Sequence, residues 1–120
     1  MATVSEPALT PELALQYLGE LSTDIKASVV VSGDGRTAAT TRPGEQGDRL
    51  RDLARELFER AEVADERPVT QVEVSTGNGA VYAVRDEHWT LAVVTGRFAL
   101  SSLMFYDLRS ILPDLQAKPA

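Results

Sequence analysis

The side chains that could do chemistry in this 120-residue chain are few and scattered. Its single histidine, His88, follows Asp86-Glu87 between two strand-like segments. A metal site or a general base requires further groups converging on the imidazole, and no other residues stand at metal-ligand spacing. We therefore predict that His88 is an ordinary surface histidine in a turn.

One glycine pattern matches a nucleotide-binding signature. Ser32–Ala38 contains G-x-G-x-x-A directly after a β-branched run. In a dinucleotide-binding fold a helix begins at these glycines, so that its N-terminus meets the pyrophosphate. Here the chain continues through Thr37–Thr40 into a loop with Pro43 and Gly44, which favours a hairpin turn. The G-x-x-x-x-G-K-[ST] sequence of P-loop GTPases and ATPases does not occur.

Nucleophilic catalysis has little support. There is no cysteine, and G-x-S-x-G does not occur. Ser101 and Ser102 stand at an expected helix start, where a hydroxyl most simply caps the helix or packs closely. Without a convergent polar cluster we predict no catalytic residue, no cofactor and no metal, and a small enzyme is the least favoured alternative.

Tyr82, Trp89 and Phe98 suggest a second alternative, a small-molecule sensor with a pocket between a sheet and the terminal helices. With aromatic residues at 6% of the chain, however, we expect these three side chains in the core. The net charge of −6 disfavours a nucleic-acid partner, because phosphate binding needs clustered Lys and Arg. Apolar runs fall short of the ~20 residues of a spanning helix, so we expect no membrane insertion and a cytoplasmic protein.

The central element is a predicted antiparallel meander of three strands, Val69–Ser75, Ala80–Arg85 and Trp89–Thr95. Asn-Gly within Thr76–Gly79 predicts a tight hairpin, because both residues accept a positive φ. Trp89–Thr95 is apolar on both sides, so both faces of the sheet must be covered. Upstream, Ala27–Ser32 and Arg36–Thr40 read as a hairpin whose first strand is buried and whose second lies near an edge. Thr41–Gly47 reads as a loop.

Three segments show helical spacing. Thr10-Pro11-Glu12 predicts a helix start, with an end between Ser22 and Ile25. Its predicted apolar stripe is Leu13, Tyr17, Leu18, Leu21 and Ile25. The strongest helix is Asp48–Ala64, with core positions Leu50, Leu53, Ala54, Leu57, Phe58 and Ala61. The last is Arg97–Leu112, with core positions Leu100, Leu103, Met104, Leu108, Ile111 and Leu112.

The order helix, two strands, helix, three strands, helix predicts a single α+β domain. Strands that are apolar on both sides require helices on each face of an antiparallel sheet. We place the domain at residues 10–115, with a disordered segment at 1–9 and a tail at 116–120.

In order and length, these elements resemble the roadblock / dynein light chain family over about Leu13–Leu115. The resemblance rests on Val29–Gly35, Asp48–Ala64, and Leu91–Thr95 followed by Leu103–Leu112; longin and profilin-like domains share related architectures. It implies a five-stranded antiparallel sheet with the middle helix on one face and the terminal helices on the other. It also implies a homodimer formed by the middle helices and by the third strands.

Mapped onto this chain, that interface involves Asp48–Ala64 and Val69–Ser75, and the latter reads independently as an edge strand that can accept a partner strand. The expected interface residues are Arg51, Asp52, Arg55, Glu56, Glu59, Val69, Gln71, Glu73 and Ser75. The helix face is charged, so two copies meet there only through complementary Arg–acid pairs.

Bacterial relatives of this family resemble regulators of small Ras-like GTPases, and some activate GTP hydrolysis. Arg51 and Arg55 are candidates to approach such a partner. Solubility and pairing within the helix explain them more simply, so we assign neither a catalytic role. The resemblance predicts a non-catalytic dimeric adaptor or regulator of a small Ras-like GTPase or a related signalling partner.

Overall fold

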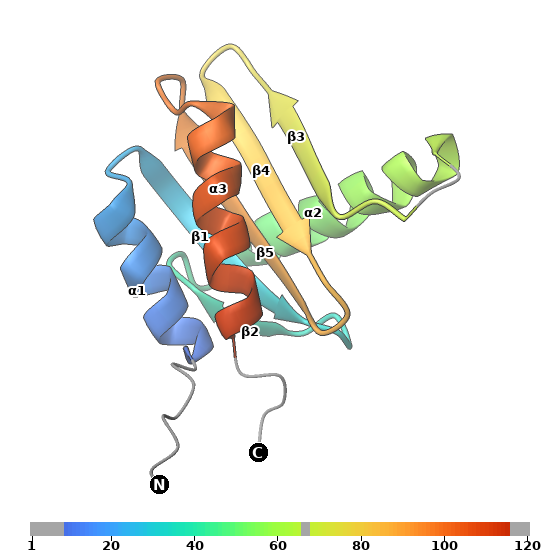
Figure 1. Cartoon of the computed structure of the whole chain (residues 1–120), viewed down its shortest axis with the longest axis horizontal. Coiled ribbons are helices and arrows are strands. Elements are labelled where there is room, and N and C mark those ends of the chain that lie inside the picture. The colour runs from blue at the N-terminus through green and yellow to red at the C-terminus, as the bar shows by residue number, and fades with distance from the viewer. Residues whose placement is uncertain (1–8, 66–67, 116–120) are drawn as a thin grey trace, which may run out of the picture.

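The computed structural model describes residues 9–65 and 68–115, which form one five-stranded antiparallel sheet with order β2-β1-β5-β4-β3 (Figure 1). The elements are α1 (Pro11–Leu21), β1 (Ile25–Ser32), β2 (Thr37–Thr40), α2 (Glu45–Ala64), β3 (Gln71–Ser75), β4 (Gly79–Arg85), β5 (Trp89–Gly96), α3 (Ser101–Ile111) and the 3-10 turn η1 (Leu112–Asp114). The predicted element order and the α+β class are confirmed. The segments expected to be a disordered start and a tail lie outside the described residues, except for Leu9.

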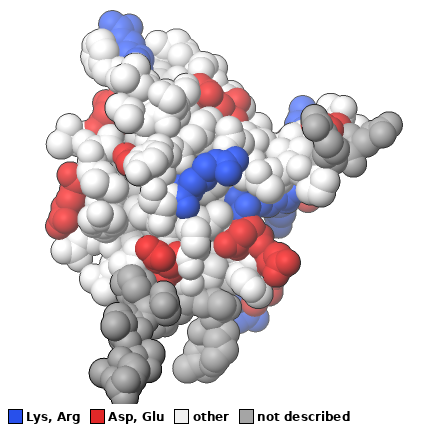
Figure 2. All heavy atoms as spheres, in the orientation of Figure 1, with Lys and Arg blue, Asp and Glu red and all other residues white. Residues whose placement is uncertain are grey.

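Helices cover both faces of the sheet. α2 packs on one face, over a cluster that includes Val29, Ala83 and Ala92. α1 and α3 lie side by side on the other face, which Figure 2 shows as largely uncharged with acidic and basic groups interspersed. Leu91 and Val93 of β5 face α1 and α3, whereas Ala92 and Val94 face α2, as the two-sided apolar pattern predicts.

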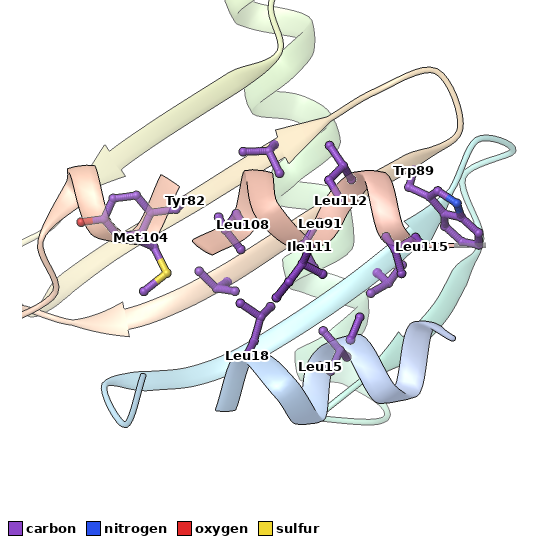
Figure 3. Close-up of a cluster of buried hydrophobic side chains, with 14 of the residues drawn as sticks. Leu15, Leu18, Tyr82, Trp89, Leu91, Met104, Leu108, Ile111, Leu112 and Leu115 are labelled. Atoms are coloured by element: carbon purple, nitrogen blue, oxygen red, sulfur yellow. The ribbon is translucent and has the colours of Figure 1, made fainter. Parts of the chain in front are cut away.

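The core beneath the terminal helices joins both ends of the chain. Leu15 and Leu18 of α1 point towards Ile111 and Leu115, next to Leu91 of β5 (Figure 3). The backbone N–H of Leu9 donates to the Asp114 carbonyl at 2.6 Å, and Leu9 bridges to Leu115. The chain thus closes on itself around this cluster.

The start of α1 is as predicted, but its buried face is not. Thr10 caps the helix through its Oγ1, which accepts from Leu13 N at 3.2 Å, and Ser22 ends it before Ile25 enters β1. Of the predicted stripe, Leu18 is buried as expected, but the predicted core positions of Leu13, Tyr17 and Leu21 are wrong because these side chains are exposed, and Ala14 and Leu15 join Leu18 in the core. Ala14 is completely buried, so a small side chain lets the helix approach the core closely.

α2 begins three residues before the predicted Asp48, at Glu45, within the segment expected to be a loop. Gly44 precedes it with φ +90°, a conformation that glycine adopts readily. A Cβ on Gly47 would lie 2.4 Å from the Arg42 carbonyl oxygen, so this glycine lets the first turn pack against the chain leaving β2.

The β3–β4 hairpin is present, but its turn chemistry differs from the prediction. Neither Asn78 nor Gly79 has a positive φ, and Gly79 already belongs to β4. The Thr76 hydroxyl accepts from Asn78 N at 3.2 Å and from Gly79 N at 3.0 Å, so a threonine side chain closes the loop.

α3 buries Met104, Leu108 and Ile111 as predicted, and Leu112 follows in the core. Leu100 and Leu103 are exposed, so their predicted core positions are wrong. The helix starts only at Ser101, which leaves Leu100 outside it as the N-cap residue, and Leu103 lies beside the buried arc. Across residues 9–65 and 68–115, no helix has both the length and the hydropathy to span a bilayer.

Candidate protein-interaction site

β3 is an open edge of the sheet, as the sequence predicts for Val69–Ser75. It pairs only with β4 in the described structure, and β4 pairs on its other side with β5. Arg85 N donates to the Thr70 carbonyl and Thr76 N to the Gly79 carbonyl, so even-numbered residues of this segment bond to β4. Because ladder bonds alternate along an antiparallel strand, the N–H and C=O groups of Gln71, Glu73 and Ser75 point outwards.

The side chains of two of these residues are held over the sheet by α3. Glu73 accepts a hydrogen bond from Ser101 Oγ at 2.7 Å, and Gln71 Oε1 accepts from Arg109 Nε at 2.7 Å. Val69 precedes β3, packs beneath α2, and its carbonyl accepts from Arg85 Nε at 2.9 Å. The backbone, more than the side chains, is therefore the free part of this edge.

An apolar shelf runs from the open edge along one flank of α2. The strand register aligns Ala27, Val94, Val81 and Val74 in one row across four strands, on the α2 face. Leu53 of α2 stands over this row, and together with Ala27 and Val94 it lines a groove of about 410 Å³. Leu53 and Val74 are each 37% exposed, unlike the core side chains around them. We call Ala27, Leu53, Val74 and Val94 the shelf.

The charged residues of the predicted interface lie elsewhere on α2. Arg51, Arg55 and Glu59 line a groove of about 380 Å³ on the opposite flank, at the end of the sheet formed by the β1–β2 and β4–β5 turns. Asp52 pairs with both arginines, through Arg51 Nε at 3.1 Å and Arg55 Nη2 at 3.6 Å. Glu56 pairs with Arg60 at 2.8 Å. The predicted pairing within the helix is confirmed.

The groove beside Arg51 carries charges of both signs. The Arg85 guanidinium stacks over Phe58 at 4.2 Å and pairs with Glu62. Glu59, Asp86 and Glu87 also line this groove. Since four acidic residues, Glu62 included, line the groove beside three arginines, the geometry does not favour a small anion.

The histidine and the glycine pattern that could have formed a chemical site both lie in turns. His88 is exposed in the β4–β5 turn, as predicted, and Asp86 Oδ1 accepts from His88 N at 2.8 Å and Trp89 N at 2.9 Å. Ser32–Ala38 is a hairpin turn leading into β2, also as predicted. No cluster of three or more His, Asp or Glu side chains in the described parts of the chain could hold a metal ion.

The three aromatic residues suggested for a ligand pocket do not share one. Tyr82 and Trp89 are buried in the core, and Tyr82 packs edge-on against Phe105 with ring centroids 5.4 Å apart. Phe98 lies in the loop before α3 and is 80% exposed, so its predicted core position is wrong.

Sequence reasoning missed the shelf. Leu53 and Val94 both fit core patterns, and exposure depends on how far α2 covers the sheet. The signal available in the sequence was the hairpin register around Thr76–Gly79, which fixes Val74 opposite Val81.

The fold is shared with known proteins of low sequence identity. A Roadblock/LC7 domain from Streptomyces avermitilis is 21% identical, with a TM-score of 0.72 over 80% of this chain and 86% of that one. The gliding protein MglB from Thermus thermophilus is 14% identical, with a TM-score of 0.61 over 92% and 89%. Profilin II from Acanthamoeba castellanii is 12% identical, with a TM-score of 0.56 over 76% and 84%. No protein-family model matches the chain, and no curated protein matches it in sequence. The roadblock resemblance is thus confirmed in the fold.

Proposed function

We propose that this chain is a non-catalytic adaptor that forms a homodimer and regulates a small Ras-like GTPase or a related signalling protein by surface contact. The observation that carries the proposal is the open backbone of β3, continuous with the apolar shelf beside α2. An unpaired edge next to exposed apolar residues is what strand addition between polypeptides requires.

A second copy fits this surface in a specific way. Antiparallel pairing of two β3 strands about a two-fold axis would use the outward N–H and C=O groups of Gln71, Glu73 and Ser75 on each copy. The same rotation would bring the β3 ends of the two shelves together at Val74, whereas Leu53, which lines its groove with Ala27 of β1 and Val94 of β5, would lie farther from the axis. The dimer would then rest on apolar contact with strand pairing, and the charged residues Asp52 and Glu56 would lie at its rim.

The GTPase partner is supported by the roadblock resemblance and by the shared fold with MglB. Arg51 has acidic partners in Asp48 and Asp52, and Arg55 pairs with Asp52. An arginine inserted into a GTPase site would have to leave these pairs. We therefore propose that the dimer acts by holding the partner's surface, without donating a catalytic side chain.

Proline substitution tests the strand-mediated dimer. Gln71→Pro removes an N–H that points away from β4, so the protomer should stay folded and sediment as a monomer. Val74→Ser, at the β3 end of the shelf, should weaken the dimer as well. Tyr106→Ser, a change at a more exposed apolar residue on the opposite face, is the control and should remain dimeric. A Gln71→Pro protein that stays folded and dimeric would rule this interface out.

The regulatory role is tested by isolating a Ras-like GTPase that co-purifies with the chain from its own cells. The wild-type dimer should change the rate of nucleotide hydrolysis or exchange on that GTPase, and Arg51→Ala should change the effect little. Rates that the dimer leaves unchanged would refute regulation, and an Arg51→Ala protein that binds but no longer acts would refute the non-catalytic assignment.

A further inference from the structure

A second apolar surface lies on the opposite side of the sheet, between α1 and α3. Leu13, Tyr17 and Leu21 follow one another at four-residue spacing and are all about half exposed. Residues on the other flank of α1, Glu12, Leu15 and Gln16, share a cavity with β2 residues Ala39 and Thr40. Tyr17 and Leu21 therefore lie on the flank towards α3, whereas Leu13 shares a cavity with Gln16 and Glu20 on the outer side of α1.

α3 presents its own apolar residue to this space. Phe105 and Arg109 lie on the flank of α3 that contacts Tyr82 and Gln71 of β4 and β3. Leu103 and Asp107, four residues apart, occupy the opposite flank, towards α1. Leu103 is exposed, and exposed Tyr106 stands next to it on the outer side.

Together these residues form a groove, which we call the terminal-helix groove: Leu9, Leu13, Tyr17 and Leu21 on one side and Leu103 on the other. On the α1 side of this surface, Leu9, Leu13 and Tyr17 line a cavity of about 400 Å³ together with Gln16, Glu20 and Asp114, and none of its described lining residues belongs to α3. The face that contains it is largely uncharged (Figure 2).

The charges that border this groove are acidic. Glu20 and Asp114 line it directly, and Asp107 stands on the α3 flank. None of the three carboxylates has an ion-pair partner within residues 9–65 and 68–115. Arg109 of α3 is engaged with Gln71, and Arg97, in the segment before α3, lies over the Phe98 ring at 5.7 Å. The groove is apolar within and anionic at its rim.

We propose that the terminal-helix groove binds an amphipathic helix of a partner protein, whose apolar residues contact Leu13, Tyr17 and Leu103 and whose Lys or Arg side chains reach Glu20 and Asp114. In helix-in-groove recognition an amphipathic helix lays its apolar face into a hydrophobic groove, which leaves its polar face to meet charges at the rim. Opposite charge at the rim speeds encounter and sets the orientation of the bound helix.

A second copy of this chain is the less suitable occupant. In a two-fold contact each groove would meet the same groove, so Glu20, Asp107 and Asp114 of one copy would face those of the other. Like charges brought together in this way oppose association. The groove is also on the other face from α2 and the shelf, so a helix can bind here while β3 pairs with another strand.

A pair of synthetic peptides tests the proposal. One is an amphipathic helix with leucines at i, i+4, i+7 and i+11 and lysines on its other face; its twin carries glutamate at every lysine position. Fluorescence anisotropy with the full chain should show binding of the lysine peptide only. The double variant Leu13→Ser/Tyr17→Ser should weaken binding about tenfold or more.

Reversing the charges at the rim of the groove gives a second, more specific test. Glu20→Lys/Asp114→Lys changes only exposed side chains, so it should fold, and it should now prefer the glutamate peptide. Val63→Ser, an exposed change on α2 outside both the shelf and this groove, is the control and should bind like the wild type. Equal affinity for both peptides, an unchanged preference after the charge exchange, or a lower sedimenting mass caused by Leu13→Ser/Tyr17→Ser would overturn the proposal, the last in favour of a second copy.

Discussion

Glu73 and Ser101 connect the open edge of the sheet to the first turn of α3. Ser101 Oγ donates to Glu73 Oε2 at 2.7 Å and lies 3.3 Å from the Tyr82 hydroxyl. A carboxylate near a helix N-terminus is stabilised by the exposed N–H groups there. This contact fixes the side chain of an edge residue while its backbone stays available.

The first prediction concerns that contact. Ser101→Ala should lower the free energy of unfolding by about 0.5–1.5 kcal/mol, because the hydrogen bond to Glu73 is lost at a partly exposed site. Ser102→Ala removes a hydroxyl with no hydrogen bond in the described structure and should have a smaller effect. Urea denaturation of both variants gives the comparison, and equal losses would contradict the assigned role.

A second prediction separates two glycines of one hairpin. A Cβ on Gly79 would lie 1.9 Å from the Thr95 carbonyl oxygen, whereas a Cβ on Gly77 would have no atom within 4 Å. Gly79→Ala should therefore destabilise the protein by about 1–3 kcal/mol or more, because the β4–β5 pair has to shift. Gly77→Ala should be nearly neutral. The melting temperatures of the two variants, measured by thermal unfolding, test this prediction. Similar values would refute the close approach of Gly79 to the Thr95 carbonyl.

The third prediction separates stability from association on α2. Phe58 is 1% exposed and lies beneath the Arg85 guanidinium, so Phe58→Ala should cost about 3–5 kcal/mol. Leu53→Ala, on the exposed flank, should cost about 1 kcal/mol or less. Both are measured in the Gln71→Pro background, since unfolding of a dimer depends on protein concentration. A Leu53→Ala loss as large as that of Phe58→Ala would show that Leu53 belongs to the core.

The fourth prediction is a pH dependence at the β1–β2 turn. Asp34 accepts from Ser32 Oγ and from Arg36 N at 3.1 Å, and the first of these bonds contributes most to a pKa below the ordinary 3.8. A lowered pKa in the folded state means that the ionised carboxylate stabilises the fold above the unfolded pKa and that this contribution is lost as pH falls through the folded pKa.

Wild type and Asp34→Ala should therefore differ in stability at neutral pH and converge at pH values well below 3.8. Because Asp34 is fully exposed, the difference should be small. An NMR titration of the Asp34 carboxyl checks the premise directly, and a midpoint at or above 3.8 would contradict it.

Spacing and caps were enough to predict the element order and the sheet class. Thr10 and Pro11 marked the start of α1, and the alternation around Leu91 required two covered faces. These signals are local, although the elements that cover the two faces around Leu91 are distant in sequence.

The faces of the helices were harder to predict. α1 has apolar residues on two arcs, and the choice of Ala14 over Leu13 for the core depends on how closely the helix approaches the sheet. Gly44 and Gly47 read as loop residues because glycine disfavours helices, yet the second is needed for contact with Arg42. The exposure of the shelf residues also depends on how much of the sheet α2 covers. This is a tertiary property, and the spacing of apolar residues in the sequence does not predict it.

The two margins of the sheet differ in length and regularity. β2 has only four residues, and its register with β1 shifts between Val30 and Val31, whereas β3 offers five residues in unbroken register with β4. If two chains join through β3, the β3 edge of each chain becomes paired. The edges that stay exposed in the joined sheet are then the two short, irregular β2 strands. The sheet would then stop growing by strand addition once two chains have joined, so this dimer would resist assembly into fibres.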